Sequence, residues 1–223
     1  MTMNYNNHMK KIIFILIIVM SLLSIISCED FLTSEPVDKL VPGNFFKSEK
    51  DLELFANSFY QRGIPSGLSV VQADEMGDYT SKIQSPKFIS GSYDSGDEAS
   101  WNWSDLRNIN YFLANFDNET IPQEARNHYE GVARFWRAQF YFEKVKRYGD
   151  VPWYSKPLST EDEYLYKPRD PRTMVMDSVL ADLNFAVENI RDTKDNSSSL
   201  ITRQVALAFK SRVCLFEGTF RKY

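Results

Sequence analysis

Apolar positions recur at helical spacing over the second half of the chain. One stripe begins after Ser104, a second ends near Tyr148, a third follows Asp170-Pro171 and a fourth follows Thr202. Spacings of three and four residues place side chains on one face of a helix, so the pattern predicts an all-α fold. In chain order, the expected inward positions are Leu106, Ile109, Leu113 and Phe116; Ala125, Val132, Trp136, Gln139 or Phe140, and Val145; Val175, Val179, Leu183, Ala186 and Ile190; and Val205, Ala208 or Phe209, Arg212 or Val213, and Phe216.

Capping signals predict an additional helix before this set. Ser48 with Asp51 resembles a capping box and precedes a further apolar stripe, Leu52, Phe55 and Phe59. Thr120 with Gln123 gives a second capping signal ahead of the long helix that ends near Tyr148, and Thr202 is expected to cap the last helix.

Long loops are expected between the helices. Gly149 is expected to end the long helix, and the chain then stays loop-like to Arg169. Residues 62–100 contain repeated glycine and proline and little helical period, and a loop of such length is usually functional or disordered.

The N-terminal 27 residues have the layout of an export signal. Lys10 and Lys11 precede an apolar run from Ile12 to Ile26, and small Ser27 stands directly before Cys28. The run is short of the roughly 20 residues that span a bilayer comfortably. We therefore expect residues 1–27 to be a lipoprotein signal peptide, with Met1 or Met9 as the start. Cys28 would be lipidated, with acyl chains such as palmitate; the alternative is an uncleaved signal-anchor helix.

Charge and composition disfavour several classes of function. The net charge is −4, and it falls to −6 once the two lysines of the signal are removed. An acidic chain lacks the basic footprint that nucleic acid requires, so no nucleic-acid partner is expected. If Cys28 carries lipid, Cys214 has no cysteine left with which to form a disulfide. The apolar helical pattern around Cys214 predicts a buried, inert thiol.

No motif indicates catalysis, a metal or a cofactor. The segment after Cys28 holds a single histidine, His128, which we expect on a helix surface, and it contains no GxGxxG, P-loop or HExxH pattern. The acid pairs Asp74-Glu75 and Asp97-Glu98 raise glycoside hydrolysis as an alternative. Adjacent acids need not flank one bond, however, so we expect a protein that binds and does not catalyse.

A weak internal repeat suggests stacked helical hairpins. Residues 132–140 align with residues 205–213, so that Ala133 and Ala206 fall at equivalent places, each within the second helix of a helix-loop-helix pair. Small residues beside large aromatics allow helices to approach closely, as in tetratricopeptide-like stacks. Ordinary helix-core spacing explains the same alignment and remains open.

Several motifs together resemble the SusD/RagB family. They are Cys28 to Leu32 with Pro36, Phe45-Phe46 and Tyr60; Ala133 to Phe142 followed by Tyr148-Gly149-Asp150-Val151-Pro152; Arg169 to Arg172 with Asp182-Leu183; and Ala206 to Arg221. The resemblance covers residues 28–223, but family members are about twice as long. It implies that this region is the N-terminal helical domain of a longer protein, present here as a fragment, a truncated gene or a frameshifted copy.

The resemblance implies an outer-membrane lipoprotein, facing outside, that captures nutrients. Family members bind glycans and pass them to a SusC-like TonB-dependent transporter, with no cofactor. The alternative is a helical scaffold that contacts the transporter without a ligand of its own.

The segment 93–107 carries the candidate ligand residues. Flat aromatic faces and directional polar groups suit sugars, which points to Tyr93, Trp101 and Trp103 with Asn102, and also to Arg107. The alternative is that Trp103 and Tyr93 serve packing. For the block 148–152 we expect a structural role, as a helix stop and a fixed crossover. Arg134 and Arg137 are expected to satisfy acids or carbonyls of a neighbouring hairpin.

Overall fold

The computed structural model describes residues 14–15, 45–64, 67, 86–97, 100–196 and 198–223. The chain divides into two units, Met1–Asn44 and Phe45–Tyr223. Most of the signal peptide, Cys28 and most of the segment 62–100 lie outside the described residues. The expectations for them are therefore not addressed by the structure.

Unit Phe45–Tyr223 is built from α-helices joined by loops. The helices are α4 (Glu49–Gly63), α6 (Lys87–Ser90), α7 (Ser104–Asn115), α8 (Gln123–Tyr148), α9 (Arg172–Asn189) and α10 (Arg203–Lys222), with short 3-10 turns η2 (Ser95–Asp97) and η3 (Glu163–Tyr166). Within the described residues the only β pairing is an isolated bridge between Val151 and Asp170. The all-α prediction is confirmed.

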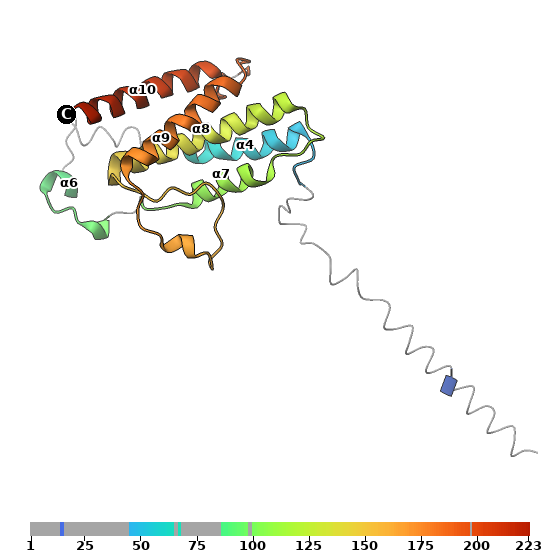
Figure 1. Cartoon of the computed structure of the whole chain (residues 1–223), viewed down its shortest axis with the longest axis horizontal. Coiled ribbons are helices and arrows are strands. Elements are labelled where there is room, and N and C mark those ends of the chain that lie inside the picture. Colours follow the sequence, from blue (N-terminus) through green and yellow to red (C-terminus); the bar gives the residue numbers. More distant parts are fainter. Residues whose placement is uncertain (1–13, 16–44, 65–66, 68–85, 98–99, 197) are drawn as a thin grey trace, which may run out of the picture. The chain divides into compact units, whose positions relative to one another are not determined.

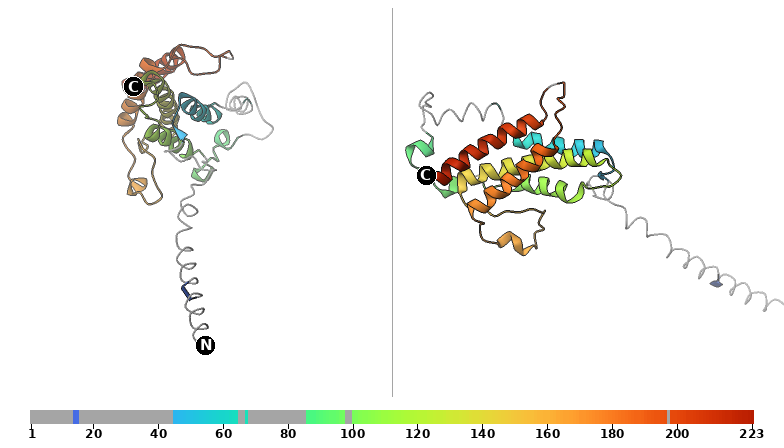
Figure 2. Two further views of the ribbon diagram at one scale, coloured as in Figure 1. Left: turned by 90° about the vertical axis from the view of Figure 1, so that its right-hand side faces the viewer. Right: turned by 45° about the horizontal axis from the view of Figure 1, so that its top comes forward.

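Helix α8 is the central element of the packing. Helices α4, α7 and α9 each pack against it, and α10 packs against α9 (Figure 1, Figure 2). The most extensive of these interfaces is the one between α8 and α9. The pairs α7–α8 and α9–α10 are successive helical hairpins, which is the stacked arrangement that the weak repeat suggested.

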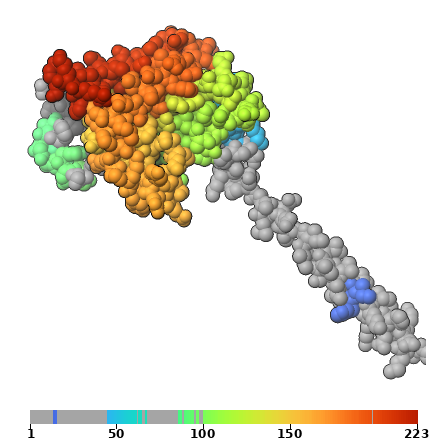
Figure 3. Space-filling model, viewed as in Figure 1, coloured from blue at the N-terminus to red at the C-terminus, as the bar shows by residue number. Residues whose placement is uncertain are grey.

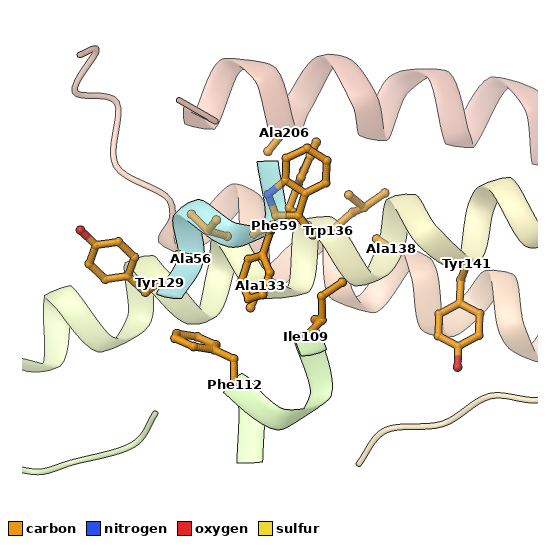
Figure 4. Close-up of a cluster of buried hydrophobic side chains, with 14 of the residues drawn as sticks. Ala56, Phe59, Ile109, Phe112, Tyr129, Ala133, Trp136, Ala138, Tyr141 and Ala206 are labelled. Atoms are coloured by element: carbon orange, nitrogen blue, oxygen red, sulfur yellow. The ribbon is translucent and has the colours of Figure 1, made fainter. Parts of the chain in front are cut away.

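One part of the core lies where α4, α7 and α8 meet. Phe59 of α4, Phe112 of α7 and Trp136 of α8 are buried in one cluster, and Ala133 lets the helices approach closely (Figure 4). Phe55, Phe59 and Phe112 pack with ring centroids 5.5–5.9 Å apart, within the range of favourable aromatic contacts. Phe112 is fully buried, although the sequence pattern placed Leu113 inward and did not select Phe112.

The helix-end signals were right in three places and wrong in one. Ser48 forms the full capping box with Asp51, Thr202 accepts a hydrogen bond from the Val205 N–H, and Gly149 ends α8 at a φ of +70°. The signal at Thr120 was wrong: its hydroxyl donates to Asn118, and α8 begins after Pro122 without a side-chain cap. Asn118 competes successfully because its amide oxygen also accepts the Thr120 N–H.

The expected inner face of α10 needs correction. Val205 is 41% exposed, and the neighbouring Ala206 takes its place in the core. Cys214 is a free, exposed thiol and not the buried one that was expected. Both errors have one cause. Among the described residues, one face of helix α10 packs against α9 and also contacts Phe142 of α8 through Phe209 and Phe216. Val205 and Cys214 lie beside this face and point outward.

The expectation for His128 also needs correction. Its ring is half-buried and accepts the Arg191 N–H through Nδ1 at 3.2 Å. By contrast, Arg137 donates to both oxygens of Asp182 at 2.7 and 2.8 Å, and Arg134 lies 3.6 Å from the same carboxylate. The expectation of an acid on the neighbouring hairpin is confirmed for Arg137, whereas the shorter ion pair of Arg134 is with Glu130 of its own helix, at 2.6 Å.

Candidate functional site

A pocket of about 680 Å³ opens between the start of α7 and the loop that joins α8 to α9. We call residues 150–171 the crossover loop. In the space-filling view this loop forms the orange-yellow lower edge of the unit Phe45–Tyr223 (Figure 3). The pocket volume lies within the range of sites for small ligands. Its lining comprises Trp101, Trp103, Ser104, Leu106, Arg107, Asn110, Pro152, Tyr154, Lys156, Pro157, Leu158, Ser159, Thr160, Leu165, Lys167, Pro168 and Arg169.

Three aromatic side chains form one side of the pocket. The Trp101 and Trp103 rings meet edge to face at 5.1 Å, and Trp103 meets Tyr154 in the same way at 5.7 Å. Trp101 is 40% exposed, and its ring also packs against Tyr148 at 4.8 Å. These contacts hold the rings in place while leaving aromatic surface open to solvent.

Tyr141 of α8 fixes the first part of the crossover loop. Its phenol oxygen accepts the Tyr154 N–H at 2.6 Å and donates to the carbonyl of Pro152 at 3.3 Å. Its ring stacks on Trp153 with centroids 4.2 Å apart, and burial raises the pKa of the phenol well above its usual value. Asn110 of α7 adds a bond from its amide to the Tyr154 carbonyl at 2.8 Å. Two buried polar side chains therefore set the position of Tyr154 at the pocket.

The two ends of the crossover loop are tied together. The Asp170 N–H donates to the Val151 carbonyl at 3.2 Å, and the Asp170 carboxylate accepts the Trp153 N–H at 2.6 Å. Lys167 donates to that carboxylate at 2.5 Å and to the Trp153 carbonyl at 2.8 Å. Burial acts to raise the pKa of Asp170, but these hydrogen bonds together outweigh it and hold the pKa below its usual value. The block 148–152 thus has the structural role expected of it.

The charged groups among the described lining residues are all cationic. Arg107 belongs to α7, while Lys156, Lys167 and Arg169 belong to the crossover loop. The Arg169 guanidinium carbon lies 5.0 Å from the centroid of the Trp101 ring, and the Lys156 ammonium lies 5.5 Å from that of Tyr164. The pocket therefore offers hydrogen-bond donors beside flat apolar faces.

The structure brings some of the sequence candidates together and separates others. Trp101, Trp103 and Arg107 line the pocket. Asn102 lines a neighbouring surface hollow, where its side-chain oxygen accepts the Ser104 N–H at 2.8 Å. The Tyr93 hydroxyl accepts from Arg147 at 2.8 Å, and Tyr93 does not line this pocket. A ligand contact by any of these residues remains a prediction.

The contacts of Trp103 also fit the alternative, in which its ring serves packing. Its ring contacts Phe140 and Tyr141 of α8 at 5.6 and 6.2 Å, and the ammonium of buried Lys144 lies 5.6 Å from its centroid. Trp103 is therefore partly core and partly pocket lining, while Trp101 is the more open of the two rings.

Sequence reasoning missed the pocket residues of the crossover loop. Tyr154, Lys156, Lys167 and Arg169 lie in a segment that was assigned only as a loop. Nothing in the spacing of that segment links it to Trp101. The signal that could have drawn attention to it was the aromatic pair Trp153-Tyr154, followed by a polar loop that carries two lysines.

The described part of the chain offers neither a metal site nor a membrane span. Within those residues, no group of three or more His, Cys, Asp or Glu side chains is placed to hold a metal ion. None of the described helices has the length and apolar composition needed to cross a membrane.

A family model matches most of the chain. Residues 30–215 match the SusD-like family described as "Starch-binding associating with outer membrane". Two relatives from Formosa agariphila are SusD-like protein P2, 26% identical over 95% of this chain, and SusD-like protein P25, 28% identical over 79% of it. The chain spans 44% and 37% of the lengths of these two relatives.

Solved structures show the same fold. A SusD-like protein from Bacteroides fragilis NCTC 9343 superposes with a TM-score of 0.67 and 26% identity, covering 84% of this chain and 39% of that one. A SusD-like carbohydrate binding protein from the same organism also gives a TM-score of 0.67, with 19% identity, and the match covers 79% of this chain and 39% of that one. The helical hairpins described above are therefore the arrangement found in this group of proteins.

Proposed function

Since the chain belongs to this SusD-like family, we propose that it binds oligosaccharides in the pocket between α7 and the crossover loop. The observation that carries the proposal is the open aromatic surface of Trp101 beside polar groups in one pocket of about 680 Å³. A sugar ring presents C–H faces that pack on aromatic rings and hydroxyl edges that need hydrogen bonds. The pocket offers both kinds of contact.

The anchoring part of the proposal rests on the sequence. Residues 1–27 serve as a lipoprotein signal peptide, and Cys28 carries the lipid that holds the protein at the outer membrane, facing outside. Several acyl chains anchor a protein stably without a spanning helix. The bound glycan would be delivered to a SusC-like TonB-dependent transporter, the partner that the family resemblance implies.

The binding proposal is tested by removing the exposed aromatic face. Trp101→Ala should weaken oligosaccharide binding by about tenfold or more, because a large contact face is lost. Isothermal titration calorimetry of the whole chain in mild detergent, against a panel of oligosaccharides, measures this. Tyr223→Ala is the matched control, since Tyr223 is 94% exposed and does not line the pocket. Equal affinities for the two variants would contradict the proposal.

The anchoring proposal has a separate test. Cys28→Ser should abolish metabolic labelling by a fatty acid, whereas Cys214→Ser should keep it. The chain has two cysteines, and each substitution replaces one of their thiols with a hydroxyl, so the two variants are chemically matched. Unchanged labelling of the Cys28 variant would show that the lipid is elsewhere or absent.

A second candidate function is a helical scaffold that contacts the transporter without its own ligand. The exposed apolar side chains of α10 favour it, with Leu207, Leu215 and Phe220 each 45–71% exposed. Under this alternative, the transporter would copurify with the chain while no oligosaccharide binds. Glycan binding is therefore the measurement that separates the two functions.

A further inference from the structure

We infer that the oligosaccharide taken by this pocket is acidic, carrying carboxylate or sulfate groups. The inference rests on the proposed function and concerns the substrate class of the same site. Its basis is the charge of the lining: Arg107, Lys156, Lys167 and Arg169 are cationic, and no aspartate or glutamate of the described residues lines the pocket. The chain as a whole is acidic, with 30 Asp and Glu against 26 Lys and Arg, so this lining runs against the overall balance.

Most of these cations have no carboxylate partner within the described part of the chain. Lys167 is paired with Asp170 at 2.5 Å. Among the residues that the structure describes, Arg107, Lys156 and Arg169 form no ion pair. At the α8–α9 interface, by contrast, buried Arg137 is paired with Asp182. The pocket therefore retains positive charge that an anionic ligand can neutralise.

The acids of the crossover loop are not part of the pocket lining. Glu161, Asp162 and Glu163 follow Thr160 at the start of η3, and none of them lines the pocket. The Asp162 carboxylate accepts the Tyr164 N–H at 3.0 Å, which caps the η3 turn. The Asp170 carboxylate, in turn, is occupied by Lys167 and the Trp153 N–H.

The cations and the aromatic faces lie at the same place. The Arg169 guanidinium lies over the Trp101 ring, and Arg107 lines the pocket from α7, whereas Lys156 lines it from the crossover loop. A guanidinium binds carboxylate or sulfate oxygens through paired N–H donors, which a neutral hydroxyl does not match. A ligand with sugar faces and acidic groups would use both features, while an acidic peptide would leave the ring faces unused.

The test compares ligands of equal length and different charge. The whole chain is titrated with maltotetraose, with a galacturonic acid tetramer, with a sulfated tetrasaccharide and with tetraglutamate, at about 50 mM and about 300 mM NaCl. We expect at least one acidic sugar to bind about tenfold or more tightly than maltotetraose, and salt to weaken that binding. The two acidic sugars distinguish carboxylate from sulfate recognition.

Matched variants locate the effect. Combined Arg107→Gln, Lys156→Gln and Arg169→Gln should remove the preference for acidic sugar. Combined Arg203→Gln, Arg212→Gln and Lys222→Gln removes the same charges from exposed positions on α10 and should preserve it. Equal loss in both triple variants would overturn the inference, because the attraction would then come from overall charge.

The remaining outcomes separate this inference from the proposed function. Binding of maltotetraose as tightly as both acidic sugars, or more tightly, overturns the inference and leaves glycan binding standing. Tetraglutamate binding as tightly as the acidic sugars overturns it in favour of an acidic protein partner. Failure of every sugar to bind overturns both.

Discussion

Arginines at the α8–α9 interface and at the pocket have opposite surroundings. Arg137 is 7% exposed and donates to both oxygens of Asp182, which is 2% exposed. Arg107 and Arg169 are exposed at the pocket and form no ion pair with a described residue. A buried charge requires a partner, whereas an exposed one is stabilised by water and can still bind a ligand. Pairing thus separates charges that hold the fold from charges that can bind.

The largest expected effect comes from breaking the buried pair. Asp182→Asn keeps the shape of the side chain but leaves the Arg137 charge without its counterion. Breaking a buried pair costs about 3–5 kcal/mol, so urea unfolding should show a loss of that size. Asp177→Asn is the control on the same helix: Asp177 pairs with Arg221, its side chain is 67% exposed, and the loss should be several-fold smaller. Equal losses of unfolding free energy in the two variants would show that the buried and the exposed ion pair stabilise the fold alike.

The same contrast explains what could be predicted from the sequence. Helical period identified the buried residues of the third stripe, Val175, Val179, Leu183, Ala186 and Ile190, because both the period and the burial follow from one helix packed along one face. The sequence also indicated partners for Arg134 and Arg137. It failed for Val205 and Cys214, since the side of a helix that is covered depends on neighbours distant in sequence.

Dependence on residues distant in sequence also explains why only part of the candidate site was predicted. Trp101 and Trp103 stand out as aromatics at a loop–helix junction, which is a local signal. Tyr154 and Arg169 join them only because Tyr141 and Asp170 fix the crossover loop beside α7. That placement depends on contacts between residues far apart in the chain, which spacing does not reveal.

A second prediction compares close packing in the core with the open face of α10. A Cβ at Gly63 would overlap the ring of buried Trp136, so Gly63→Ala should destabilise the fold by about 1–3 kcal/mol. A Cβ at Gly218 would meet no atom of the described residues within 4 Å. Gly218→Ala should therefore stabilise the protein by about 0.5–1 kcal/mol through helix propensity. Thermal and urea unfolding measure both; the same sign for both variants would contradict the packing argument.

A third prediction concerns His128, where a half-buried group makes stability depend on pH. Burial, aided by the charge of Arg191, lowers the pKa of His128 to about 4 from 6.5. The unfolded chain then binds a proton that the folded chain does not, so stability falls as pH drops from about 6.5 towards about 4. Partial solvation limits the loss to about 1–2 kcal/mol.

The measurement for His128 is urea unfolding at a series of pH values. His128→Gln should flatten the dependence between about pH 6.5 and about pH 4, because it removes the titrating group. The charges of Glu49 and Glu124, which both pair with Arg191, act to raise the pKa of His128. A pH dependence in the His128→Gln variant as steep as in the parent would show that groups other than His128 cause it.

The smallest expected effect lies at the pocket, where Arg107 is exposed and has no ion pair with a described residue. Arg107→Gln removes an exposed charge from α7 and replaces it with a residue of similar helix propensity, so the free energy of unfolding should stay within about 0.5 kcal/mol of the parent. Urea unfolding measures it beside the Asp182→Asn variant. A loss comparable to that of Asp182→Asn would place Arg107 among the charges that hold the fold and would remove the reason to assign it to a ligand.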